Sequence, residues 1–256
     1  MVDKDYILLN KLVIPSDSVR GMTKSQKRQY LMITNMLRDL NLLQKLLLFT
    51  NNNERPDEPT ESANTTISFF FLKTLISKNH EMWEFMEKEG LLRERFDGKL
   101  RELRKEVDDF FSIQGNRDIF SFIRNKFGFH YEADHRHKRE LEDLIEPAMN
   151  DHEMDMWLSS DDSGNEIFGS SNAVMLKVIF QRMREKGSNG DDKGLMKQLV
   201  GLTLKISKIF REFYLMYLVE IVLRDIELQD LGTVKVMAPL LSKMKLPLIV
   251  KCDRHE

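Results

Sequence analysis

The feature that most limits how this chain can fold is its shortage of helix-breaking residues, with 12 glycines and 6 prolines among 256 residues. A protein built from many short strands needs frequent turns, and turns depend heavily on glycine and proline. The residue types that dominate the sequence are Leu, Lys, Glu, Met and Arg, which all favour helix. We therefore predict an all-α fold.

Apolar residues recur at helical spacing through most of the chain. The clearest stripe, with charged residues on the opposite side, consists of Leu92, Phe96, Leu100, Leu103, Val107 and Phe110. Such spacing predicts helices over residues 23–49, 65–79, 83–113, 138–149, 172–186 and 190–228. Thr23 is the expected cap of the first helix, and a turn at residues 114–116 is expected to precede the helix that contains Arg124. Helices in this order predict an up-and-down bundle.

Two segments depart from the helical pattern. Residues 51–64 are polar and contain two prolines, which indicates a surface loop. Residues 154–169 consist of two short runs around a polar, glycine-containing turn, a pattern typical of a small β-hairpin. A chain of 256 residues with 41% hydrophobic residues can bury a sizeable core, so we expect one large domain or two intimately packed halves, and we treat residues 1–256 as a single helical domain.

The composition limits the compartment and the partners of the protein. The single cysteine, Cys252, cannot form an intramolecular disulfide, and the acidic first residues do not resemble a signal peptide. Every apolar run is shorter than the roughly 18 to 20 residues that span a bilayer. These features predict a cytoplasmic protein without a membrane segment. Because the net charge is −2, any contact with nucleic acid has to be local.

Residues 121–131 contain the main candidate for chemistry. Arg124, Asn125 and His130 interrupt an otherwise aromatic and apolar run, and on a helical projection His130 falls inside the apolar stripe and Arg124 at its edge. An arginine can stabilise charge on a phosphate, and a histidine can carry a proton near neutral pH, so the pair could cleave RNA without a metal ion. The alternative is that both residues are purely structural, with His130 in the core beside a hydrogen-bond partner and Arg124 in an ion pair.

The order of these residues resembles the motif of the HEPN superfamily, which is an arginine, a polar residue directly after it, and a histidine some four to six positions later. Arg124, Asn125 and His130 match this motif residue by residue. The resemblance implies an up-and-down bundle of four or five helices with additions, here over residues 65–225. It also implies a metal-independent endoribonuclease, of the kind found in microbial defence and toxin systems, that often assembles its site from two copies.

The resemblance assigns a role to each residue of the motif. The RNA 2′-hydroxyl would attack the adjacent phosphate, His130 would act as general base or acid, and Arg124 would neutralise charge on the phosphate oxygens. Asn125 would orient the histidine or the phosphate. A homodimer would supply two copies of each group. Some family members have lost catalysis and serve as binding or dimerisation modules, and the near-neutral charge of this chain favours that alternative.

A second constellation is the pair His135 and His137. Two imidazoles two residues apart suit a shared metal ion on a strand, and Asp134 could add an oxygen ligand. A charged surface turn is the simpler interpretation. The sequence also has no glycine-rich phosphate loop, nucleophile elbow or zinc-binding helix motif, so we predict neither a metal ion nor a cofactor.

Overall fold

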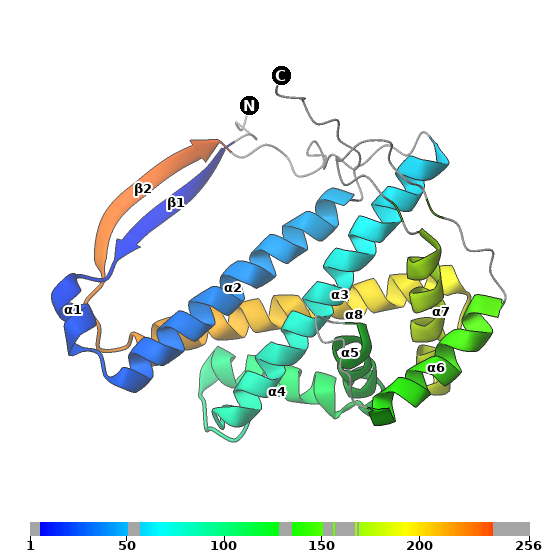
Figure 1. Ribbon diagram of the computed structural model, residues 1–256. Coiled ribbons are helices and arrows are strands. Elements are labelled where there is room, and N and C mark those ends of the chain that lie inside the picture. The colour runs from blue at the N-terminus through cyan, green and yellow to red at the C-terminus, as the bar shows by residue number, and fades with distance from the viewer. Residues whose placement is uncertain are drawn as a thin grey trace.

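The fold is taken from a computed structural model that describes residues 6–50, 57–127, 135–150, 156, 167 and 169–237. Within these residues, the chain runs from a first β-strand through eight α-helices and a π-helical turn to a second β-strand, which lies beside the first (Figure 1). In chain order the elements are β1 (Tyr6–Val13), α1 (Ser16–Gly21), α2 (Lys24–Thr50), α3 (Glu58–Lys88), α4 (Gly98–Ser112), α5 (Gln114–Phe127), α6 (His135–Asn150), α7 (Gly169–Glu185), α8 (Asp192–Tyr217), η1 (Leu218–Val222) and β2 (Gln229–Met237). The prediction of a mostly helical chain is confirmed. The fold is not all-α, because β1 and β2 form a sheet.

Helix α2 begins with a capping box. The Thr23 hydroxyl accepts a hydrogen bond from the backbone N–H of Gln26 (3.1 Å), and the Gln26 side chain accepts one from the backbone N–H of Thr23 (2.9 Å). This reciprocal pair satisfies two N–H groups that have no partner within the helix. The predicted helix and its Thr23 cap are confirmed.

Helix α3 begins earlier than the sequence pattern predicts. The Asp57 carboxylate accepts a hydrogen bond from the backbone N–H of Thr60 (2.8 Å), and Pro59 lies in the first turn, where a backbone N–H would have no intrahelical partner. The predicted loop over residues 51–64 is therefore wrong for residues 58–64, which are helical. Residues 51–56 lie outside the described part of the chain.

The predicted continuous helix over residues 83–113 is also wrong, because the chain turns after α3. Gly90 has a φ of 75°, a left-handed conformation that glycine adopts without strain. The backbone N–H of Leu91 then bonds to the carbonyl of Met86 (2.9 Å), which closes the end of the helix. The apolar stripe therefore belongs to a loop and to α4 rather than to one long helix.

The core forms where α3 packs against α2, α5, α7 and α8. Phe210 and Tyr214 of α8 and Phe120 of α5 are fully buried, and the rings of Phe210 and Tyr214 stack with their centroids 6.0 Å apart. The Tyr214 hydroxyl donates a hydrogen bond to the carbonyl of Met82 in α3 (2.6 Å). Burial raises the pKa of Tyr214 well above its ordinary value, so this hydroxyl remains a donor. Both apolar packing and a hydrogen bond thus join α8 to α3.

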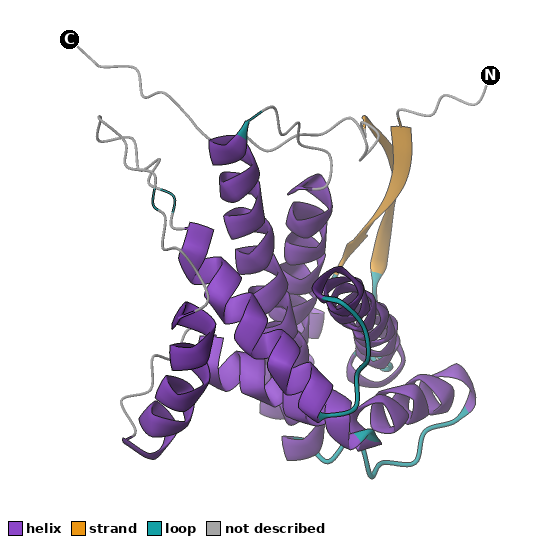
Figure 2. Cartoon of the chain, turned by 90° about the vertical axis from the view of Figure 1, so that its right-hand side faces the viewer, coloured by secondary structure: helices purple, strands orange, loops and turns teal. Residues whose placement is uncertain are grey.

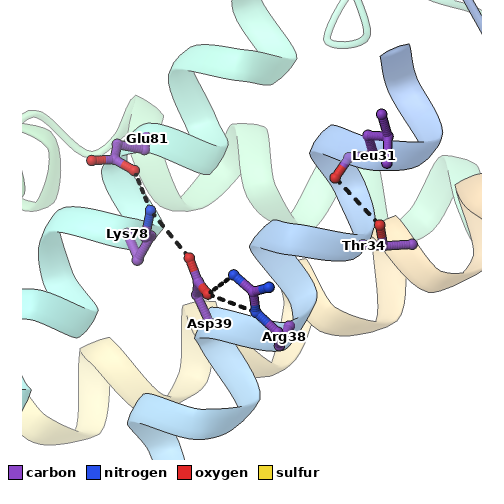
Figure 3. Close-up of polar contacts among 6 residues, drawn as sticks. All are labelled: Leu31, Thr34, Arg38, Asp39, Lys78 and Glu81. Carbon is purple, nitrogen blue, oxygen red and sulfur yellow. Dashed lines mark hydrogen bonds and ion pairs between the residues drawn. The ribbon is translucent and has the colours of Figure 1, made fainter. Parts of the chain in front are cut away.

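A charged network fixes how α2 lies on α3 (Figure 3). The ammonium of Lys78 in α3 lies 3.5 Å from a carboxylate oxygen of Asp39 in α2 and 2.9 Å from Glu81, and Arg38 contacts the same Asp39 at 3.0 Å. Burial lowers the pKa of Lys78, but Glu81 and Asp39 outweigh burial and the net shift is upward. Since His80 follows Lys78 by two residues, about 200° around the helix, it lies on a different side of α3 from this network.

Strands β1 and β2 form an antiparallel ribbon at the edge of the helices (Figure 2). The pairing runs from Tyr6 opposite Met237 to Val13 opposite Gln229, with an irregularity where Gly232 has a φ of 89°. The sequence patterns did not predict this ribbon. The hairpin predicted over residues 154–169 falls almost wholly outside the described residues and stays a prediction.

Candidate functional site

Helix α5 presents the arginine of the predicted motif at its last turn. Ile119, Phe120, Ile123 and Phe127 are buried, as the predicted apolar stripe requires, whereas Arg124 is only partly buried. The helix ends at Phe127, and His130 lies outside the described residues. The structure therefore positions Arg124 and Asn125 and leaves the role of His130 a prediction.

Contacts from two helices hold the Arg124 guanidinium. Its Nη1 lies 3.4 Å from a carboxylate oxygen of Glu84 in α3 and donates a hydrogen bond to the side-chain oxygen of Asn125 (3.2 Å). The Asn125 amide in turn donates to the Ser121 hydroxyl (3.3 Å). Asn125 thus orients the arginine in this structure, and its expected contact with the histidine or the phosphate stays a prediction.

His80 of α3 joins the same cluster, although the sequence analysis did not single it out. It is 4% exposed, its ring packs edge-on against Trp83 (5.3 Å between centroids), and its Nδ1 lies 3.5 Å from Glu84. Burial lowers the pKa of His80 to about 4; Glu84 opposes this shift, and Arg124 and Arg117 add to it. His80 is therefore neutral near pH 7, too weak a base to serve as the acid or base of a reaction at that pH.

A second arginine of α5 lies on the same side of the helix as Arg124. Arg117 precedes Arg124 by seven residues, which is about two helical turns. Its guanidinium lies over the Trp83 ring at 4.8 Å from the centroid, and Trp83 stacks on Phe111 at 5.0 Å. The aromatic contact holds Arg117 in place without neutralising its charge.

We call these groups, His80, Glu84, Arg117, Arg124 and Asn125, the α3–α5 seam. The seam carries two guanidinium groups and one carboxylate, and its histidine is neutral near pH 7. Lys88 adds a further cation 3.4 Å from Glu84. A site of this composition suits an anion such as a phosphate group.

The described residues do not offer a metal site. No cluster of three or more His, Cys, Asp or Glu side chains suited to a metal ion occurs among them. The backbone of His135 and His137 is helical, because α6 begins at His135. The hypothesis of a shared metal ion at these two positions required a strand, and the backbone there is a helix instead.

A pocket of ≈ 390 Å³ opens near the beginning of α5, away from Arg124. Its polar lining includes Asn116, Lys186 and Ser188. Lys186 is paired with Asp118 across a 2.5 Å contact, so its charge is already balanced. None of the seam residues lines this pocket, so the two features are separate.

Comparison with known protein families, curated proteins and solved structures finds no match to this chain. Within the described residues, no helix is long and apolar enough to cross a membrane.

The buried His80 makes a pH-dependent contribution to stability. The unfolded chain binds a proton at this residue below about pH 6.5, whereas the folded protein binds it only below about pH 4. The contribution is therefore complete above pH 6.5 and is lost as the pH falls towards 4, with an upper limit of about 3 kcal/mol. Urea unfolding of the wild type and of His80→Gln at several pH values measures this contribution. Between pH 6.5 and pH 4 we expect the free energy of unfolding to fall more in the wild type than in the variant. Equal decreases would contradict a lowered pKa of His80 in the folded protein.

Proposed function

We propose that the chain is a HEPN-like, metal-independent endoribonuclease whose catalytic residues are Arg124 and His130, with Asn125 as a positioning residue. The observation that carries this proposal is the arrangement around Arg124. Two neighbours hold its guanidinium at the end of α5, and the chain reaches His130 six positions later. The mostly helical fold agrees with the helical bundle that the motif resemblance implies.

The reaction needs one proton acceptor, one proton donor and a cation. The RNA 2′-oxygen forms a bond to the adjacent phosphorus and passes its proton to a histidine, while the bond to the 5′-oxygen breaks and that oxygen takes up a proton. The products are a 2′,3′-cyclic phosphate and a 5′-hydroxyl. Arg124 stabilises the negative charge that grows on the non-bridging oxygens. Two copies of His130 in a homodimer would provide the acid and the base together.

Glu84 would position Arg124 without blocking it. A guanidinium has five N–H donors, and the contacts to Glu84 and Asn125 both use Nη1. Other donors of the group can therefore bind a phosphate oxygen while Glu84 keeps the side chain in place. Arg117, on the same side of α5, would contact a neighbouring phosphate of the RNA strand.

A non-catalytic interaction or dimerisation module is the second candidate, and two observations favour it. Glu84 already compensates the charge of Arg124, and the ribbon of β1 and β2 exposes many apolar side chains. The net charge of −2 is also low for a protein that binds RNA broadly. For either candidate we propose a reducing, cytoplasmic compartment, because Cys252 is the one cysteine in the sequence.

The test is an incubation of the purified protein with a mixed RNA pool, with and without a chelator, beside the His130→Ala variant. The proposal expects chelator-resistant cleavage that leaves 2′,3′-cyclic phosphate ends and disappears in the variant. Equal cleavage by both proteins would point to a contaminating ribonuclease. A folded, stable and inactive wild type would favour the interaction module.

A further inference from the structure

The outer face of helix α8 is strongly basic. Five exposed cations of this helix fall within about 60° of Lys208 when each residue turns the helix by 100°. Of the two carboxylates of α8, Glu212 lies in the same sector, whereas Asp192 falls on nearly the opposite side and pairs with Arg184. We call the five cations the α8 stripe: Lys193, Lys197, Lys205, Lys208 and Arg211.

Most of the charge of the α8 stripe is not compensated by an ion pair. The ammonium of Lys208 lies 4.0 Å from a carboxylate oxygen of Glu212, and both side chains are well exposed. Within the part of the chain that the structure describes, none of the other four cations has a carboxylate oxygen within 4.0 Å. The stripe extends for about 27 Å along the helix axis. Five cations and one carboxylate give this face a net charge of +4, in a protein whose overall net charge is −2.

A glycine lies in the middle of the stripe. Gly201 is exposed and falls on the same face, between Lys197 and Lys205. Glycine is unfavourable inside a helix compared with alanine. The fold does not require it here, because its φ is not positive and a Cβ at this position would meet no atom within 4 Å. A missing side chain does, however, let a bound molecule come close to the helix backbone.

The residue types on this face indicate which kind of partner it fits. Between Lys193 and Arg211, α8 exposes no large apolar side chain. Protein interfaces have an apolar core and contain little lysine, and helices that bind membranes bury apolar side chains in the lipid. A narrow line of cations along one helix instead matches the row of phosphate groups in a nucleic-acid strand. The charge of the stripe is therefore complementary to a phosphate backbone.

We propose that the α8 stripe binds the phosphate backbone of a single RNA strand, which comes closest to the helix at Gly201. The cations donate hydrogen bonds to phosphate oxygens, a contact that does not read the base sequence. The choice of RNA rests on the proposed function, but the binding does not require cleavage, and a non-catalytic module would use the same surface. The contact is local, in agreement with the near-neutral charge of the whole chain.

Fluorescence anisotropy of a labelled 2′-O-methyl RNA of roughly 12 nucleotides tests the proposal, since this length covers a typical single-strand site. The blocked 2′-oxygen cannot attack the phosphate, so the experiment measures binding without cleavage. We expect the logarithm of the association constant to fall with the logarithm of the salt concentration with a slope of about −3, as four neutralised phosphates predict.

Two double variants test which cations carry the binding. Lys197→Glu with Lys205→Glu should weaken binding at least about tenfold near 0.1 M salt and reduce the salt slope by about half, because two phosphate contacts are lost. Lys99→Glu with Arg20→Glu is the matched control, since it changes the net charge equally at exposed cations of α4 and α1. This control should bind RNA nearly as tightly as the wild type.

A substitution at Gly201 tests the close approach without a change of charge. Glutamine favours helix more than glycine does, and its Cβ has open space here, so Gly201→Gln should stay folded by circular dichroism. We expect this variant to bind the RNA several-fold more weakly. Binding equal to that of the wild type would contradict a closest approach at Gly201.

Three outcomes would overturn the proposal as a whole. These are a wild type that does not bind the RNA at low salt, equal losses in the two double variants, and binding of phosphatidylserine vesicles but not RNA through the stripe. Cleavage without binding at the stripe would overturn this inference and leave the proposed ribonuclease standing. Binding at the stripe without cleavage of unmodified RNA would do the reverse.

Discussion

Replacing Arg124 with alanine is expected to reduce RNA cleavage at least about a hundredfold while the protein stays folded, because a group that stabilises transition-state charge typically contributes that much. The side chains of Arg124 and Glu84 are 27% and 24% exposed, and Lys88 still lies beside Glu84 when Arg124 is lost, so the loss should cost on the order of 1 kcal/mol of stability. Initial rates on a defined RNA, with circular dichroism as the folding check, measure both effects. Arg124→Lys should recover only part of the rate, since lysine keeps the charge but loses the planar set of donors.

Arg182 provides a matched control within the same chain. Like Arg124 it lies in the last turn of its helix, is 30% exposed and pairs with a carboxylate, here Glu185 at 3.0 Å. Its guanidinium also packs over an aromatic ring, that of Phe122. Arg182→Ala should leave cleavage nearly unchanged. Equal losses in Arg124→Ala and Arg182→Ala would indicate a general structural effect and contradict the assigned role of Arg124.

The helices could be predicted because each buries one side, and the apolar residues of that side recur at helical spacing along the sequence. In α5 four of the five buried residues follow the predicted stripe, and the Thr23 cap of α2 is a purely local signal. The errors occur at residues that are compatible with more than one local structure. Proline is common both in loops and in the first turn of a helix, and Pro59 lies in the first turn of α3. Glycine can lie within a helix or follow its end, and Gly90 follows the end of α3.

The ribbon of β1 and β2 could not be predicted from local patterns. Its two strands are separated by more than two hundred residues, and no turn motif connects them. Each strand alone is a short run that gives no indication of its partner. Pairing between such distant segments depends on how the helices bring the strands together.

The candidate site was predicted in part. Arg124 lies at the edge of the apolar stripe, and the ion pair of the structural alternative is present, with Glu84 as the partner. Glu84 and Arg124 are forty residues apart in the sequence, so only the packing of α3 on α5 reveals their contact. His80 was missed because it lies in an apolar helix; its one local signal is Glu84 four residues later, one turn along the same side.

The packing of α8 against the neighbouring helices should account for a large share of the stability. Phe210 has no exposed surface, stacks on Tyr214 and lies 6.1 Å from the ring of Phe111 in α4. Truncating a buried phenylalanine leaves a cavity that a close-packed core fills only partly. We expect Phe210→Ala to lower the free energy of unfolding by about 3 to 5 kcal/mol.

Urea unfolding beside Phe70→Ala separates this cavity effect from the loss of an aromatic ring as such. Phe70 is 44% exposed on α3, so its truncation creates no closed cavity and should cost about 1 kcal/mol or less. If both variants lost the same small amount, Phe210 would not be packed between Phe111 and Tyr214 as described. A large loss in Phe210→Ala alone would instead mean that this aromatic contact between α8 and α4 lies in a closely packed core, where the lost ring leaves a cavity.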